Sequence, residues 1–140
     1  MGDEIKKLPL TVAMICTIEK IACSTDPARQ QDAVFCGFFR FCIAGRIRIA
    51  DAVRIIDEPY ISESPGQAGD FVESKLRGAR YKTGHGARKR RHTLPVAAPC
   101  AHILYPEWAR SWIRLRYKLG MNASEDRTLM RAPNDDGSFF

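Results

Sequence analysis

The spacing of apolar residues is the feature of this sequence that most constrains its fold. Apolar residues recur every three or four positions in three stretches of the first 56 residues, and again between residues 106 and 119. This spacing places them on one face of a helix. Two short runs between these stretches, over 71–76 and 90–96, read as strands. We therefore predict an α+β fold that is mainly helical and has a small antiparallel sheet.

Start and stop signals define the first two predicted helices. Thr11 is the expected N-cap of the first helix. The apolar face of this helix comprises Met14, Ile18 and Ile21. The segment 24–27 supplies an N-cap candidate followed by proline, so a second helix is predicted to start there and to end at Gly45. Its expected core stripe comprises Val34, Phe38, Phe41 and Cys42.

Two further helices follow from the same spacing. The third is predicted over 48–56, with Arg48 in its first turn. It would bury Ile49, Ala52, Val53 and Ile56. The fourth is predicted over 106–119 and is capped by Gly120. Its core face comprises Trp108, Trp112, Leu115 and Leu119, and its solvent face comprises Arg110, Arg114, Arg116 and Lys118.

The segments around the predicted strands read as surface structure. The stretch over 61–69 is rich in Ser, Pro and Gly, so we predict a surface connection there. Pro95 is expected to mark a sheet edge or a strand end, because proline cannot donate a ladder hydrogen bond.

Positive charge is concentrated in one part of the chain. The formal net charge is +6, and the segment from Lys75 to Arg91 holds eight Lys or Arg residues and no acid. Cationic side chains beside glycines could lie along a nucleic-acid backbone and release its counterions. The residues expected to contact DNA are Arg46, Arg88, Lys89, Arg90 and Arg91. A solvated hairpin and a nuclear-localisation run are the other interpretations of this segment.

Two short motifs contain basic residues that could hold one phosphate. The first is Arg48-Ile49-Ala50-Asp51, and the second is Tyr81-Lys82-Thr83-Gly84. They resemble the first arginine box and the β-hairpin lysine of the tyrosine recombinases, or phage-type integrases, and more loosely the versions in eukaryotic retroelements. The resemblance covers roughly residues 8–121 and implies a fold like the front half of the recombinase catalytic domain.

The resemblance implies roles for three residues. Arg48 would stabilise charge on a DNA phosphodiester, and Asp51 would help to position the arginine box. Lys82 would protonate the departing 5′ oxygen. This chemistry uses no metal and no cofactor, and other recombinase protomers are its natural partners. The resemblance therefore implies DNA recombination or integration as the ancestral function.

The family's remaining catalytic groups have no counterpart here. The family places a His-x-x-Arg box and a nucleophilic tyrosine well downstream of the hairpin lysine, whereas this chain ends at Phe140. The segment His85-Gly86-Ala87-Arg88 matches the letters of the box but lies in the hairpin, so we treat it as a coincidence. We expect residues 1–121 to be a partial recombinase-like domain and 122–140 to be the irregular tail of a truncated chain. Such a chain would bind DNA without cleaving it.

Two other functions stay open from the sequence. One is a noncatalytic basic module that binds RNA or DNA, in which Arg48 and Lys82 need not meet. The other is a secreted or membrane-associated protein, because Lys6 and Lys7 precede an apolar stretch, as in a secretory signal. Glu19 interrupts that stretch where a cleavage site should begin, which favours a helix instead.

The cysteines also bear on location. The chain has five cysteines and no Cys-x-x-Cys pair, which is typical of buried thiols in a reducing compartment. The set His85, His92, Cys100 and His102 matches no usual zinc spacing, so we expect no metal site. We therefore expect an intracellular protein, nuclear if the source is eukaryotic, with no membrane partner.

Overall fold

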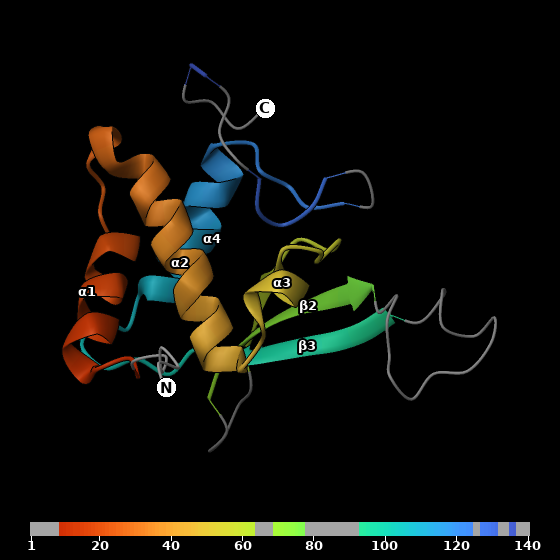
Figure 1. The fold of residues 1–140 in the computed structure, drawn as a ribbon, viewed down its shortest axis with the longest axis horizontal. Helices are drawn as coiled ribbons and strands as arrows, with labels where there is room; N and C mark the ends of the chain where they lie inside the picture. Colours follow the sequence, from red (N-terminus) through yellow and green to blue (C-terminus); the bar gives the residue numbers. More distant parts are fainter. Residues whose placement is uncertain (1–8, 64–68, 78–92, 125–126, 132–134, 137–140) are drawn as a thin grey trace, which may run out of the picture.

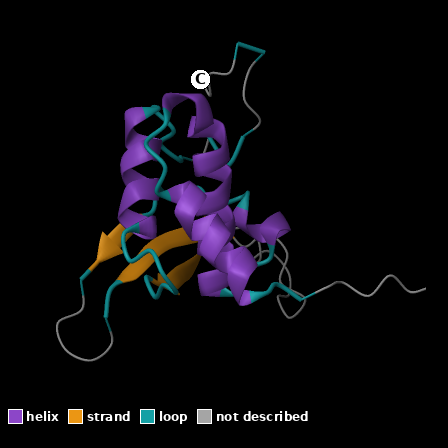
Figure 2. Ribbon diagram, turned by 90° about the vertical axis from the view of Figure 1, so that its left-hand side faces the viewer, coloured by secondary structure: helices purple, strands orange, loops and turns teal. Residues whose placement is uncertain are grey.

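A bundle of helices packs on one side of a small sheet (Figure 1 and Figure 2). The computed structural model describes residues 9–63, 69–77, 93–124, 127–131 and 135–136. The helices in these residues are α1 (Val12–Ala22), a 3-10 turn (Pro27–Arg29), α2 (Gln30–Gly45), α3 (Ile49–Ala52) and α4 (Trp108–Lys118). The strands are β1 (Tyr60–Ser62), β2 (Phe71–Arg77) and β3 (Thr93–Pro99). The predicted α+β class, mainly helical with an antiparallel sheet, is confirmed.

The sheet has the order β1-β2-β3, and both strand pairs are antiparallel. β2 and β3 pair along their whole length, from Phe71 opposite Pro99 to Arg77 opposite Thr93. Pro95 lies in the edge strand β3, as predicted. β3 is shifted three residues downstream of the predicted run, and β1 includes two residues of the predicted surface connection.

α2 is the central helix, with α1 and α4 against it and the sheet beneath (Figure 1). Its core stripe is buried as predicted and comprises Val34, Phe38, Phe41 and Cys42. From α4, Trp108 and Trp112 are fully buried, also as predicted. The Trp112 ring lies 5.4 Å from the Phe41 ring, centroid to centroid. Gly37 makes this approach possible, because a Cβ there would overlap the Trp112 side chain.

Helices α2 and α4 end in the hydrogen-bond pattern of a Schellman motif. At the end of α4, Gly120 has a positive φ of 71°, and the Met121 N–H donates to the Arg116 carbonyl at 2.9 Å. At the end of α2 the left-handed residue is Arg46, with a φ of 52°. The glycine lies one position earlier, because a Cβ at Gly45 would come within 3.2 Å of Ala98 on β3. The glycine therefore allows the end of α2 to pack against the sheet. The next residue, Arg46, adopts the left-handed conformation that ends the helix.

The third helix is shorter than predicted. α3 ends at Ala52, and Ile55 then forms an isolated antiparallel bridge with Leu76 of β2. Ile55 is fully buried, whereas Ile49, which was predicted to be buried, is 51% exposed. The prediction was wrong because residues after α3 pair with the sheet, which changes the face that is covered.

A buried ion pair joins α1 to α2. Glu19 is fully buried, and its carboxylate accepts a hydrogen bond from Arg40 Nε at 2.8 Å. The same carboxylate accepts from the backbone N–H groups of 103–105, each at 3.0 Å in its closest contact. Arg40 Nη2 donates to the Ala101 carbonyl at 2.8 Å. These bonds fix the loop before α4 against α1 and α2.

The hydrogen bonds around Glu19 also determine its acidity. Burial by itself would raise the pKa of Glu19, but the hydrogen bonds from Tyr105, Leu104, Arg40 and Ile103 outweigh it and hold the pKa below its ordinary value. The sequence did not indicate this role, because the expected apolar face of α1 omitted Glu19. Met14, which belonged to that face, is 49% exposed.

A second buried arginine holds the segment after α4. Arg116 was predicted to be solvated, but its side chain is fully buried and binds Glu58 through Nε at 2.9 Å and Nη2 at 2.8 Å. Its other donors reach the carbonyls of Leu129, at 2.7 Å, and Met121, at 2.6 Å. Glu58 also accepts from the Ala123 N–H at 2.8 Å. The prediction was wrong because all these partners lie far from Arg116 in the sequence or outside its helix.

The two arginines have matching surroundings. The Arg40 guanidinium lies 5.1 Å from the centre of the Trp108 ring, and the Arg116 guanidinium lies 5.5 Å from that of Trp112. Each contact adds a cation–π attraction to the ion pair. We refer to Arg40, Glu19 and Trp108 as the Arg40 unit, and to Arg116, Glu58 and Trp112 as the Arg116 unit.

Replacing Gly37 by alanine should destabilise the fold, because the added methyl group overlaps the Trp112 side chain. We expect a loss of about 1–3 kcal/mol in the free energy of unfolding, even though alanine is the better helix former. Urea denaturation of the wild type and the variant measures this loss. In a Trp112→Leu background the same Gly37→Ala change should cost less. Equal costs in both backgrounds would contradict the proposed contact.

Replacing Glu19 by glutamine should lower the free energy of unfolding at pH 7 by about 3–5 kcal/mol, because Arg40 is then buried without a counter-charge. The folded pKa of Glu19 lies below the reference value of 4.5. Its stabilisation is therefore complete above that value and is lost as the pH falls through the folded pKa. Urea unfolding from pH 7 to pH 2.5 should show the difference between wild type and variant shrinking below about pH 4.5.

Glu63→Gln is the matched control, because the Glu63 side chain is 76% exposed. It should change little at any pH. If the loss in free energy of unfolding caused by Glu19→Gln stays constant down to pH 2.5, the effect is due to packing and not to charge.

Candidate nucleic-acid interface

Two of the predicted site residues lie on the connection between α2 and α3. Arg46 and Arg48 are both exposed. Arg48 is the N-cap residue of α3, and its carbonyl accepts from the N–H groups of Asp51 at 3.0 Å and Ala52 at 2.9 Å. Arg48 is thus at the start of the third helix, one residue before its first turn.

Asp51, to which the resemblance gives a role in positioning the arginine box, forms an ion pair with Arg54. Its Oδ1 accepts from Arg54 Nη2 at 2.9 Å. Both side chains are more than a third exposed, so this pair contributes little to stability. The observed contact therefore joins a residue within α3 to a residue two positions after the end of that helix.

The other predicted contacts lie outside the described residues. These are Lys82, Arg88, Lys89, Arg90 and Arg91. The structure does describe the two strands that flank them, and the last pair of the β2–β3 ladder is Arg77 opposite Thr93. Residues 78–92, which we call the basic connection, therefore join two paired strand ends. This segment holds six Lys or Arg residues and no acid.

Arg46 and the basic connection are associated with opposite ends of the sheet. The residue before Arg46 packs against Ala98, near the end of β3. The basic connection precedes Thr93, at the start of β3. Five residues of strand separate the two positions, about 17 Å. Figure 1 shows the same arrangement, with the end of α2 over one end of the strands, and with the end of β2 and the start of β3 at the other.

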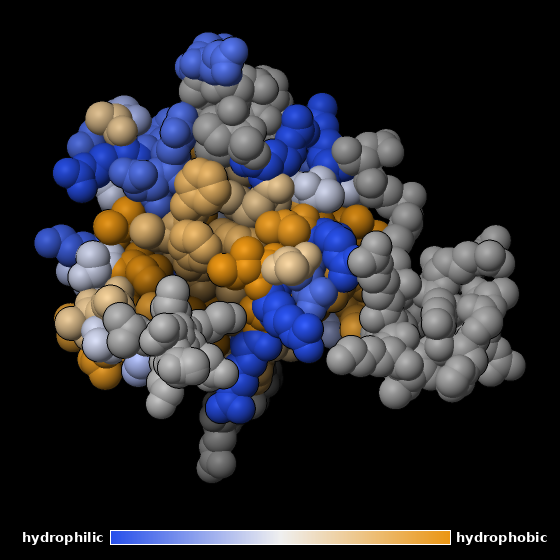
Figure 3. Space-filling model, in the orientation of Figure 1, coloured by the Kyte–Doolittle hydropathy of each residue, from blue (hydrophilic) through white to orange (hydrophobic). Residues whose placement is uncertain are grey.

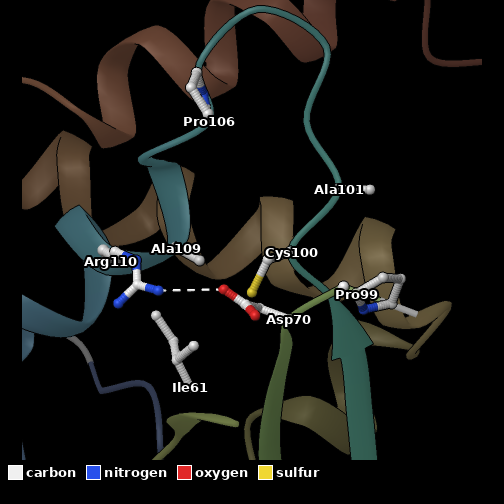
Figure 4. A pocket seen from close by; sticks show the side chains of 9 residues that line it. Ile61, Asp70, Pro99, Cys100, Ala101, Pro106, Ala109 and Arg110 are labelled. Atoms are coloured by element: carbon white, nitrogen blue, oxygen red, sulfur yellow. Dashed lines mark hydrogen bonds and ion pairs between the residues drawn. The ribbon is translucent and has the colours of Figure 1, made fainter. Parts of the chain in front are cut away.

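A pocket of about 310 Å³ lies between α4 and the end of the sheet where β3 finishes (Figure 4). Arg110 of α4 points across it to Asp70, with Nη2 and Oδ2 3.2 Å apart. Glu63 lies 3.7 Å from the same nitrogen. Arg110 was predicted to face solvent but is partly covered and has two carboxylate neighbours. The pocket therefore does not present an unpaired cation to an anionic ligand.

Cys100 lines the same pocket beside Asp70 (Figure 4). Burial raises the pKa of the Cys100 thiol, the Asp70 charge raises it further, and Arg110 partly opposes both. Cys100 is therefore a neutral thiol near pH 7 and not an activated nucleophile. Among the residues with described positions, no three His, Cys, Asp or Glu side chains are grouped closely enough to hold a metal ion.

Sequence reasoning did not find the Asp70–Arg110 contact. The two residues are 40 positions apart, and neither belongs to a motif. The only signal was an isolated acid directly before a strand, which is common on protein surfaces. By contrast, the five cysteines are free thiols, as predicted, but only Cys42 is buried and the other four are partly exposed.

Comparison with known proteins finds no family model that matches this sequence, and no similar curated protein or solved structure. The recombinase resemblance therefore rests on its two motifs alone. Within the described ranges, the helices are all too short or too polar to cross a lipid bilayer.

Proposed function

We propose that this protein is a noncatalytic nucleic-acid-binding module whose contact element is the basic connection between β2 and β3. The observation that supports it is the fully paired β2–β3 ladder, which extends to Arg77 and Thr93 at the two ends of an acid-free cationic segment. The preferred partner is DNA, bound through its phosphates. The protein would act inside the cell, and in the nucleus if its source is eukaryotic.

The charge distribution favours a phosphate backbone as the target. The segment has six cations in 15 residues and no acid of its own. Lys75 extends the positive charge onto the exposed side of β2. Contacts of this kind depend on salt and are indifferent to base sequence. The module would therefore bind DNA with little preference for base sequence.

A narrower candidate is a recombinase-type DNA-binding protein. The exposed position of Arg48 at the start of α3 favours it. In this version Arg48 and Lys82 contact one phosphate, and other recombinase protomers assemble on the same DNA. The pairing of Asp51 with Arg54 favours the broader module, because Asp51 is then engaged with another arginine.

Replacing Arg88, Lys89, Arg90 and Arg91 together by serine should weaken DNA binding at least tenfold. Fluorescence anisotropy with a labelled 20-base-pair duplex between 50 and 200 mM salt measures it. The slope of log K against log salt should fall by about 3–4, because four phosphate contacts are lost. The matched control removes four exposed cations elsewhere, Lys20, Arg29, Arg114 and Lys118. Equal losses in both variants would reduce the effect to net charge and contradict the proposal.

Arg48→Ala, Lys82→Ala and the double variant distinguish the two candidates in the same assay. If both side chains contact one phosphate, the two losses should be non-additive. If the broader module is right, Lys82→Ala should weaken binding two- to fivefold and Arg48→Ala should have no effect. Additive losses, or no loss for either, would exclude the recombinase-type arrangement.

A further inference from the structure

An apolar groove of about 410 Å³ lies where α1 meets the end of α2. Its walls come from three parts of the chain. They include Leu10, Ile18, Phe39, Ile43, Ile47 and Ile49. Figure 3 shows apolar side chains gathered over α2 on this face of the molecule, with hydrophilic side chains beside α3.

The groove leaves large apolar side chains in solvent. Leu10 is 52% exposed, Ile49 is 51% exposed and Phe39 is 38% exposed. Contiguous exposed apolar surface is a feature of interaction sites. Most of the groove is formed by helices and the turn between α2 and α3, and Leu10 comes from the segment before α1.

Two cations are sequence neighbours of residues that line the groove. Arg46 and Arg48 alternate along the chain with Ile47 and Ile49, which line it, and both arginines are exposed. In the described part of the protein, neither arginine has an ion-pair partner. The apolar groove therefore adjoins two exposed cations that no described carboxylate neutralises.

These properties restrict the occupant. A small ligand is normally buried over most of its surface, but this groove is open at Leu10 and Ile49, whose side chains are 52% and 51% exposed. A bilayer surface favours a protruding apolar patch, whereas this site is hollow. A second copy of the chain would bring the same positively charged surface against itself across a two-fold axis. An amphipathic helix fits, because it inserts one face and leaves the other in water.

We propose that this groove docks an amphipathic helix of another protein, with apolar side chains in the groove and acidic side chains facing Arg46 and Arg48. The proposal does not depend on nucleic-acid binding. It assigns these two arginines to a protein partner and leaves DNA contact to the basic connection, near the opposite end of the sheet.

The test uses the full chain and two labelled synthetic 18-residue helical peptides as probes. They share one leucine-rich face, and the polar face is glutamate in one and lysine in the other. Fluorescence anisotropy at 150 mM salt should show the glutamate peptide binding at least tenfold more tightly. The double variant Arg46→Glu, Arg48→Glu should lose at least fivefold for the glutamate peptide and gain for the lysine peptide. Because both residues are exposed, this result does not depend on core packing.

Ile43→Asp should weaken binding of the glutamate peptide at least tenfold, with its helical circular dichroism retained. Leu104→Asp is the matched apolar control, because Leu104 is 65% exposed outside the groove and should not affect binding. Arg29→Glu with Arg114→Glu is the charge control. Equal binding of the two peptides, or no effect of the Arg46 and Arg48 reversal, would overturn the proposal.

Two other outcomes would also overturn it by identifying a different occupant. Dimerisation of the wild type in light scattering that Ile43→Asp abolishes would assign the groove to a second copy. Flotation with anionic phospholipid vesicles, without binding of either peptide, would assign it to a membrane surface.

Discussion

The arrangement of this fold depends on two buried arginines, each of which is paired with a glutamate and lies over a tryptophan. In the Arg40 unit the glutamate also accepts three backbone N–H groups, so α1, α2 and the loop before α4 meet at one carboxylate. A buried ion pair gains little over an apolar contact, because both charges lose their hydration. Its value here is in orientation, since the partners are satisfied in one geometry only.

The Arg116 unit performs the same task at the other end of α4. It binds Glu58, which precedes the sheet, and the carbonyl of Leu129, which follows α4 by ten residues. The two tryptophans of these units lie one helical turn apart on α4, on the side that meets α2 at Gly37. The close contact between α2 and α4 therefore also determines where the guanidinium groups of Arg40 and Arg116 lie.

The spacing of apolar residues was sufficient to predict which side chains are buried where one face of a helix is apolar. The core stripe of α2 and the two tryptophans of α4 were predicted because apolar side chains on one face have no other stable location. Arg116 was misplaced by the same reasoning, because spacing treats a charge as solvent-facing and cannot show that distant carbonyls will satisfy it. Ile49 was misplaced because Ile55, further along, pairs with β2 and ends the helix early.

The candidate site was predictable to a smaller extent. The position of Arg48 at a helix start followed from the sequence, but the pairing of Asp51 with Arg54 depends on how tightly the short α3 turns. The Asp70–Arg110 contact and the apolar groove are formed by segments that meet only in the folded chain. Composition indicated a positive surface, and the fold adds that its densest part is attached at the end of a paired hairpin.

Pro95 also affects how the edges of two copies of the sheet could pair. It is the third of the seven residues of β3, the longer of the two outer strands of the sheet. An open strand edge is a template for stacking between copies, and such stacking leads to fibrils. A residue without an N–H cannot donate to an added strand, so Pro95 interrupts that template within β3.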